Sequence, residues 1–128
     1  MSTLPEALNE AWENRRGPAV FGTVDVRGTA NLVYVSCVWR LSERQFLIAD
    51  NYFHKTRANI LAESRGALLF ITRQGKSYQV KGSIDYHTSG DIYETLKRWN
   101  AERNRDFPPV GAAVLNIEEV YGSADRLA

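Results

Sequence analysis

Residues 51–59 concentrate chemically active side chains at the point where an apolar strand is expected to give way to a helix over 56–64. A helix N-terminus carries roughly half a positive charge and leaves its first amides unpaired, so acids are favoured there. Lys55 and Arg57 occupy this end instead, and the nearest acid on the helix side is Glu63. A bound anion, most often a phosphate, would compensate them. The alternative is a solvated basic turn, which would cost under about 1 kcal/mol.

The apolar strand expected around 32–39 is a second candidate for ligand contact. Tyr34 and Ser36 share one face of this strand, where they would either hydrogen-bond a planar heterocycle or face solvent. The sequence favours neither interpretation. Cys37 falls on the opposite face, among apolar residues, and is expected to be a small buried hydrophobic residue.

Residues 75–77, Gly-Lys-Ser, resemble part of a phosphate-binding P-loop. The motif also requires a glycine at the position of Phe70 and a helix after the loop, whereas this segment is predicted to turn between two strands. A polar hairpin is therefore the better interpretation, from which Lys76 or Ser77 would still reach a ligand.

Metal and acid–base chemistry receive little support. His54, His87 and Cys37 are the strong nitrogen and sulfur ligands, and no two of them have zinc-like spacing. Glu118 and Glu119 are adjacent, so they point in opposite directions and are expected to be solvated. We expect no metal site, and no catalytic residue is assigned.

The elements that would position these residues are mainly strands. A helix is expected near the N-terminus, a short one over 56–64 and the longest one from Asp91, where Leu96 and Trp99 continue an apolar face. The predicted strands cover 19–27, 30–40, 45–50, 67–72, 77–86 and 112–117. So many strands with so few helices favour an antiparallel barrel decorated by helices over a doubly wound parallel sheet.

The composition is that of an ordinary globular protein. The 128 residues predict a single domain over 1–128, with 44% hydrophobic and 24% charged residues. A net charge of +1 provides no global field to attract nucleic acid or an anionic membrane. One cysteine, no signal-peptide pattern and no run of about 20 apolar residues predict a soluble cytoplasmic protein.

With these pieces in place, residues 19–121 resemble the pyridoxamine 5′-phosphate oxidase-like FMN-binding split-barrel superfamily. The strongest part of the likeness is 48–56, a strand that ends in Asn51-Tyr52 and is followed by basic and hydroxyl residues. The stretch 54–59 is also similar to that of small bacterial FMN-binding proteins. Residues 79–82 and the ending at 114–122 give secondary support.

The resemblance implies a six-stranded antiparallel split β-barrel, mainly β with peripheral helices, that binds FMN and transfers two electrons through it. It implies that the FMN phosphate is held by His54, Lys55 and Thr56. The residues implied to contact the rest of FMN are Tyr34, Val35 and Ser36 along the ring, Asp50 and Asn51 at the adjacent strand end, and Ser77 and Gln79 from the next hairpin. Family members are homodimers with FMN at the interface, so Trp99 or the C-terminal segment would complete a neighbour's site.

Departures from the family pattern argue against true pyridoxamine phosphate oxidase activity. Ser36 stands where those oxidases place a substrate-binding lysine, and their substrate-phosphate residues do not recur around 99–107. The function expected is therefore a flavin-dependent oxidoreductase of unknown substrate. The alternatives are a flavin carrier or sensor, a barrel that holds deazaflavin or haem (the latter through His54 or His87), and a ligand-free module for single strands, which the charge balance disfavours.

Overall fold

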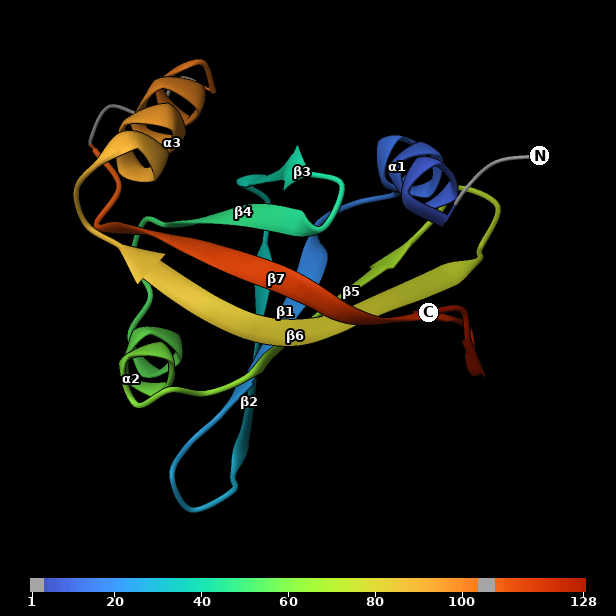
Figure 1. The fold of residues 1–128 in the computed structure, drawn as a ribbon, viewed down its shortest axis with the longest axis horizontal. Coiled ribbons are helices and arrows are strands. Elements are labelled where there is room, and N and C mark those ends of the chain that lie inside the picture. The colour runs from blue at the N-terminus through green and yellow to red at the C-terminus, as the bar shows by residue number, and fades with distance from the viewer. Residues whose placement is uncertain (1–3, 104–107) are drawn as a thin grey trace.

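The computed structural model describes residues 4–103 and 108–128 and folds them into three helices and eight strands (Figure 1). The helices are α1 (Leu4–Glu13), α2 (Lys55–Leu61) and α3 (Asp91–Ala101). The strands are β1 (Ala19–Val24), β2 (Ala30–Val35), β3 (Val38–Ser42), β4 (Gln45–Asp50), β5 (Gly66–Ile71), β6 (Ser77–His87), β7 (Gly111–Gly122) and β8 (Asp125–Arg126). None of the described helices is long and apolar enough to cross a membrane.

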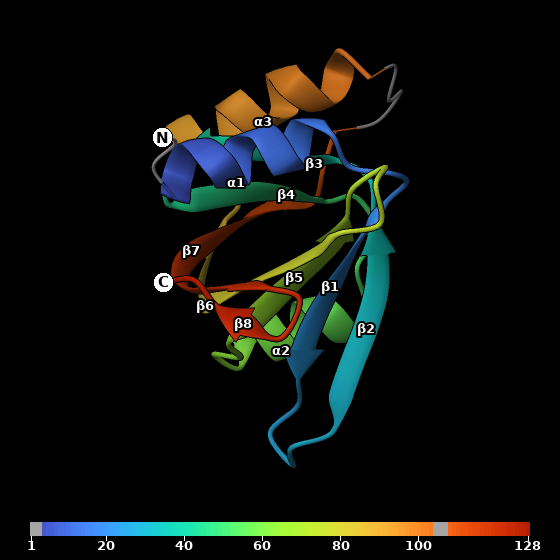
Figure 2. The same ribbon diagram turned by 90° about the vertical axis from the view of Figure 1, so that its right-hand side faces the viewer.

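All the strands belong to one antiparallel sheet, in the order β2-β1-β5-β6-β7-β4-β3, and β8 pairs with β7. The sheet curls into a half-barrel, and α1 and α3 lie at the end that holds β3 and β4 (Figures 1 and 2). The predicted fold class, mainly β with peripheral helices, is confirmed.

The predicted number of six strands is wrong. The segment 30–40 forms two strands, because the chain bends at Ser36-Cys37 and leaves β1 as its partner to pair with β4. The two-residue β8 adds the eighth strand. The last major strand also runs five residues past its predicted end at 117, to Gly122, since the long β6 offers it a partner along its length.

The curl depends on a bulge in the two long strands that cross the middle of the molecule (Figure 1). Lys81 pairs with Glu119 but Gly82 pairs with Ile117, so β7 carries one extra residue at this point. The backbone then passes so close that a Cβ on Gly82 would lie 1.6 Å from the Asn116 carbonyl oxygen. Only glycine fits at this bend.

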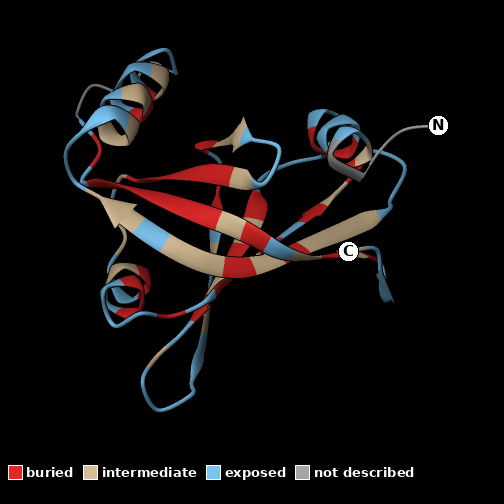
Figure 3. Cartoon of the chain, viewed as in Figure 1, coloured by how far each residue is buried: buried red, intermediate tan, exposed pale blue. Residues whose placement is uncertain are grey.

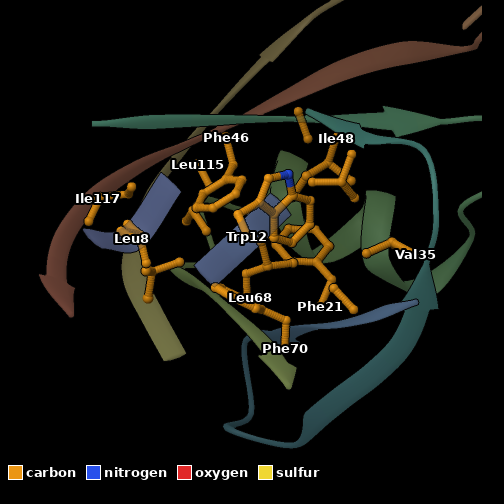
Figure 4. Close-up of a cluster of buried hydrophobic side chains, with 14 of the residues drawn as sticks. Leu8, Trp12, Phe21, Val35, Phe46, Ile48, Leu68, Phe70, Leu115 and Ile117 are labelled. Carbon is orange, nitrogen blue, oxygen red and sulfur yellow. The ribbon is translucent and has the colours of Figure 1, made fainter. Parts of the chain in front are cut away.

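The main core fills the concave side of the sheet and is closed by α1 (Figures 3 and 4). Trp12 of α1 packs edge-on against Phe46 at 4.9 Å and Phe70 at 5.1 Å between ring centroids. A smaller cluster lies under α3, where Leu96 is fully buried and Cys37 packs beside it. The expected burial of Cys37 and of Leu96 on the apolar face of α3 is confirmed.

Candidate functional site

A pocket of about 330 Å³ lies where the curled sheet fails to close. β2 and β3 stand at opposite ends of the pairing order, yet the linker at Ser36-Cys37 joins them directly. Among the described strands β2 and β3 share no ladder, so the sheet is open along this seam. The pocket is lined by Asn31, Val33, Tyr34, Val35, Ser36, Cys37, Ala49, Asn51, Tyr52, Phe53, His54, Lys55 and Thr56. We call it the seam pocket.

A buried carboxylate shapes one wall of the seam pocket from behind. Asp50, the last residue of β4, is fully buried and accepts hydrogen bonds from Arg57 Nε at 2.6 Å and Nη2 at 2.9 Å. It also accepts from the Phe53 backbone N–H at 2.7 Å and from the Tyr86 hydroxyl. These contacts join β4, the 51–54 loop, α2 and β6. Asp50 therefore sets the path of the loop that lines the pocket.

The same contacts shift the pKa values of the group. Burial alone would raise the pKa of Asp50, but the hydrogen bonds from Arg57, Tyr86 and Phe53 outweigh it and lower that pKa. Burial, followed by the hydrogen bond to Asp50, raises the pKa of Tyr86 to about 12. The pKa of Arg57 is raised by its hydrogen bonds to Asp50. At neutral pH the cluster thus holds a carboxylate, a guanidinium and a neutral phenol.

This pairing corrects the reading of α2 as a helix with two uncompensated cations at its start. Arg57 is neutralised by Asp50, an acid that lies before the helix and reaches it through the fold. Lys55 remains exposed at the pocket and enters no ion pair with another described residue. α2 is also shorter than predicted, because Glu63 adopts a φ of 67° and the chain leaves the helix.

Thr56 gives the basic end of the pocket a directed hydroxyl. Its side chain is buried, and Asn31 Nδ2 donates to its Oγ1 at 3.0 Å. Since the oxygen accepts this bond, the hydroxyl proton is left to donate to an acceptor in the pocket. Lys55 and Thr56 together can therefore offer a charge and a hydrogen bond to one oxyanion.

The opposite end of the pocket is held by contacts from Asn100 of α3 and from Arg103 in the turn that follows this helix. Arg103 Nη1 donates to the Ser36 carbonyl oxygen at 2.7 Å and fixes the bend between β2 and β3. Asn100, which is 1% exposed, donates through Nδ2 to Asn51 Oδ1 at 3.0 Å. The Asn100 Oδ1 is buried and has no hydrogen-bond partner within the part of the chain that the structure describes. These contacts make α3 a support for the pocket, not part of its lining.

Seven of the expected site residues meet in the seam pocket, namely Tyr34, Val35, Ser36, Asn51, His54, Lys55 and Thr56. Asp50 lies behind its wall, as described above. Ser77 and Gln79 lie on β6, outside the lining, and Trp99 lies on α3 with its ring centroid 6.0 Å from that of Trp39.

The lining also contains residues that the sequence reasoning missed, namely Asn31, Val33, Cys37, Ala49, Tyr52 and Phe53. Asn31 and Val33 share a face of β2 with Val35, so alternation along this strand was an available signal for them. Asn31 also donates a hydrogen bond to Thr56, 25 residues away in the sequence. No local pattern indicates this contact.

Three solved structures with the same fold cover nearly all of the chain. HupZ of Group A Streptococcus matches with a TM-score of 0.81 and 23% identity over 95% of this chain and 94% of that one. An FMN-binding protein of Syntrophomonas wolfei matches with a TM-score of 0.77 and 16% identity over 91% and 83%. A haem-binding protein of Mycobacterium smegmatis matches with a TM-score of 0.74 and 11% identity over 95% and 54%. The fold thus occurs in proteins that bind either cofactor.

Sequence comparison gives a relative and a family. An uncharacterized protein of Methanocaldococcus jannaschii, MJ0282, is 35% identical over 75 residues, which are 59% of this chain and 50% of the relative. The match therefore spans about half the length of that protein. The family model described as pyridoxamine 5′-phosphate oxidase matches residues 4–124. The chain belongs to the pyridoxamine 5′-phosphate oxidase family, with the split-barrel fold of its FMN-binding members.

Proposed function

We propose that the seam pocket binds FMN and that the protein is a flavin-dependent oxidoreductase. The observation that carries the proposal is the composition of the pocket, which combines a wall of consecutive β2 residues with the Lys55 cation and the Thr56 hydroxyl. A flavin mononucleotide has the matching parts, a flat ring system and a terminal phosphate. Family membership and the FMN-binding neighbour support the same cofactor.

The residues present fit this cofactor. Lys55 and Thr56, with His54 beside them, would hold the phosphate, while Tyr34, Val35 and Ser36 would lie along the ring. Bound FMN would supply two-electron transfer to and from a small-molecule partner. The chain orients it, since Asp50 sets the 51–54 loop and Arg103 fixes the carbonyl of Ser36. No lining residue is assigned as a general acid or base.

We further propose that the protein works as a homodimer whose second copy covers the seam pocket. Support comes from large apolar side chains beside the pocket that are left in solvent, of which Tyr34 is 78% exposed, Tyr52 79% and Leu32 70%. Family resemblance supports the same arrangement. Sedimentation velocity on the purified protein should give a dimer that Leu32→Glu converts to monomer, whereas a monomeric wild type would contradict this proposal.

The first experiment is the visible absorption spectrum of the purified protein, before and after FMN is added and free flavin is removed by gel filtration. A two-band flavin spectrum that elutes with the protein is expected. Lys55→Ala should weaken FMN binding by about 1–3 kcal/mol, the range for a charged hydrogen bond. Lys97→Ala is the matched control, because Lys97 is exposed on α3 and does not line the pocket. Equal affinities in the two variants would remove Lys55 from the site.

Turnover separates an oxidoreductase from a flavin carrier or sensor. The FMN-loaded protein should oxidise NADH or NADPH faster than free FMN at the same concentration. If FMN binds but no reductant is consumed above that background, a carrier or sensor replaces the enzyme in this proposal.

Haem is the second candidate, because His54 places an imidazole in the lining and a neighbour of the same fold binds haem. His87 lies on β6 outside the lining. If haem is the ligand, added hemin will give a Soret band that persists through gel filtration and is lost in His54→Ala. FMN retained under the same conditions, with hemin excluded, would reject this candidate.

A further inference from the structure

A second cavity, of about 490 Å³, lies between α1, β3 and the C-terminal end of α3. It is separate from the seam pocket and shares no lining residue with it. Figures 1 and 2 show α1 and α3 on the same side of β3 and β4, so the two helices flank the floor that β3 provides. We call this space the arginine cavity, after Arg15, Arg40 and Arg103 in its lining.

Three guanidinium groups meet in this cavity with one carboxylate, that of Glu13. Within residues 4–103 and 108–128, none of the three arginines forms an ion pair. Each donates to a backbone carbonyl instead: Arg15 to Trp12 at 2.9 Å, Arg40 to Glu43 at 2.8 Å and Arg103 to Ser36 at 2.7 Å. Most of their N–H groups are therefore left for another acceptor.

Arg40 gives the clearest sign of a missing partner. Its guanidinium lies 4.9 Å from the centre of the Phe46 ring, and its buried Nη1 has no hydrogen-bond partner among the described residues, which is rare for a charged donor. Burial lowers the pKa of both Arg15 and Arg40, and the nearby charge of Arg103 lowers that of Arg15 further, while Glu13 and Glu43 offset only part of these shifts. An anion in the cavity would relieve both the desolvation and the mutual repulsion of these groups.

The walls of the cavity are aromatic. Trp12, Trp39 and Trp99 all line it, and the rings of Trp39 and Trp99 lie 6.0 Å apart at 46°. The Arg15 guanidinium stacks 3.9 Å from the centre of the Trp12 ring and that of Arg103 lies 5.0 Å from Trp39. These cation–π contacts hold the guanidinium groups against the indoles, and a guanidinium has further N–H donors that can bind an oxyanion.

We propose that the arginine cavity is a second ligand site, which binds a small aromatic molecule that carries a phosphate or carboxylate group. Its arginines would take the oxyanion and the half-buried indoles of Trp39 and Trp99 would take the ring. The volume lies within the range of small-molecule sites. The proposal does not depend on FMN in the seam pocket.

Tryptophan fluorescence reports on this cavity, because the three tryptophans of the chain all line it. The purified full chain, at constant flavin content, is titrated with adenosine monophosphate, with benzoate and with uncharged adenosine. A saturable change with adenosine monophosphate or benzoate, and none with adenosine, is expected. The stronger of the two anions is then used with the variants.

Arg40→Gln should weaken the binding of that anion about tenfold or more, the loss expected for a charged hydrogen bond. Arg27→Gln, in the exposed turn before β2, is the matched control and should change it less than about twofold. Arg40→Lys keeps the positive charge but not the planar guanidinium group, so it should bind the anion with intermediate affinity. This graded loss separates weakened binding from a folding defect in Arg40→Gln. Lack of saturation with both anions, equal binding of adenosine, or unchanged affinity in Arg40→Gln would overturn the proposal.

Discussion

Replacing Asp50 by asparagine tests whether the buried carboxylate organises the seam pocket. The substitution keeps the size of the side chain and removes its charge. In the native protein Asp50 accepts from Arg57, Tyr86 and the Phe53 backbone N–H. Asparagine has one oxygen for the four donors of these three residues, and its amide group would face at least one of them. Asp50→Asn therefore leaves buried donors without an acceptor.

The cost follows from the burial of the two partners. Removing one member of a buried ion pair costs about 3–5 kcal/mol. The lower end applies here, because Asp50 is fully buried but the Arg57 side chain is 30% exposed and regains water. With an m-value of about 1.5 kcal/mol/M, a loss of about 3 kcal/mol lowers the urea midpoint by about 2 M.

The dependence of stability on pH gives an independent readout. The folded pKa of Asp50 is lowered, so its contribution is present above the unfolded pKa of about 3.9 and is lost as pH falls through the folded value. The free energy of unfolding of the wild type should thus decline below about pH 4, and Asp50→Asn should lack that part of the decline.

Asp125→Asn is the control, because Asp125 is exposed in β8 and its change should cost less than about 0.5 kcal/mol. Equilibrium urea unfolding of the three proteins between pH 3 and pH 7 supplies the whole comparison. An Asp50→Asn midpoint within 0.3 M of the wild type, or an acid decline of undiminished size, would refute the role given to this carboxylate.

Three further changes test other parts of the fold. Gly82→Ala should destabilise the protein by about 3 kcal/mol, measured by urea unfolding, because its Cβ would lie 1.6 Å from the Asn116 carbonyl oxygen. Asn59→Ala should cost about 1–3 kcal/mol in the same assay by leaving the buried Thr23 hydroxyl without its 3.0 Å donor, and a loss below 0.5 kcal/mol would contradict this. The pKa of Tyr86 is raised to about 12 in the folded protein. Its contribution to the free energy of unfolding is therefore complete below the ordinary pKa of 10.0 and is lost as pH rises toward 12. Tyr86→Phe should remove this loss of stability at alkaline pH, as measured by thermal melts. The same fall of Tm with pH in the variant and the wild type would show that another group causes it.

Local patterns in the sequence were sufficient for much of the fold and for one side of the pocket. Strand alternation, helix-start signals and breaker residues placed most elements within a few residues, because each depends on neighbours in the chain. His54, Lys55 and Thr56 were found together because they are contiguous. Tyr34 and Ser36 followed from alternation along one strand.

The remaining features depend on contacts between distant segments. Nothing near Arg57 in the sequence indicates that Asp50 neutralises it, and Tyr86 joins them from 36 residues away. The bend at Ser36-Cys37 was missed because apolar residues continue through it. It exists because the two halves of the segment pair with opposite ends of the sheet.

The width of the seam between β2 and β3 can vary while the rest of the fold is kept. The edges of the seam are not joined by a β ladder in the described strands, so its width can change without breaking backbone hydrogen bonds. Substitutions at the bend or at Arg103 would then enlarge or narrow the site while the core under α1 stays intact. A gap of this kind lets one barrel accept ring systems of different size over evolutionary time, in keeping with the FMN-binding and haem-binding proteins that share this fold.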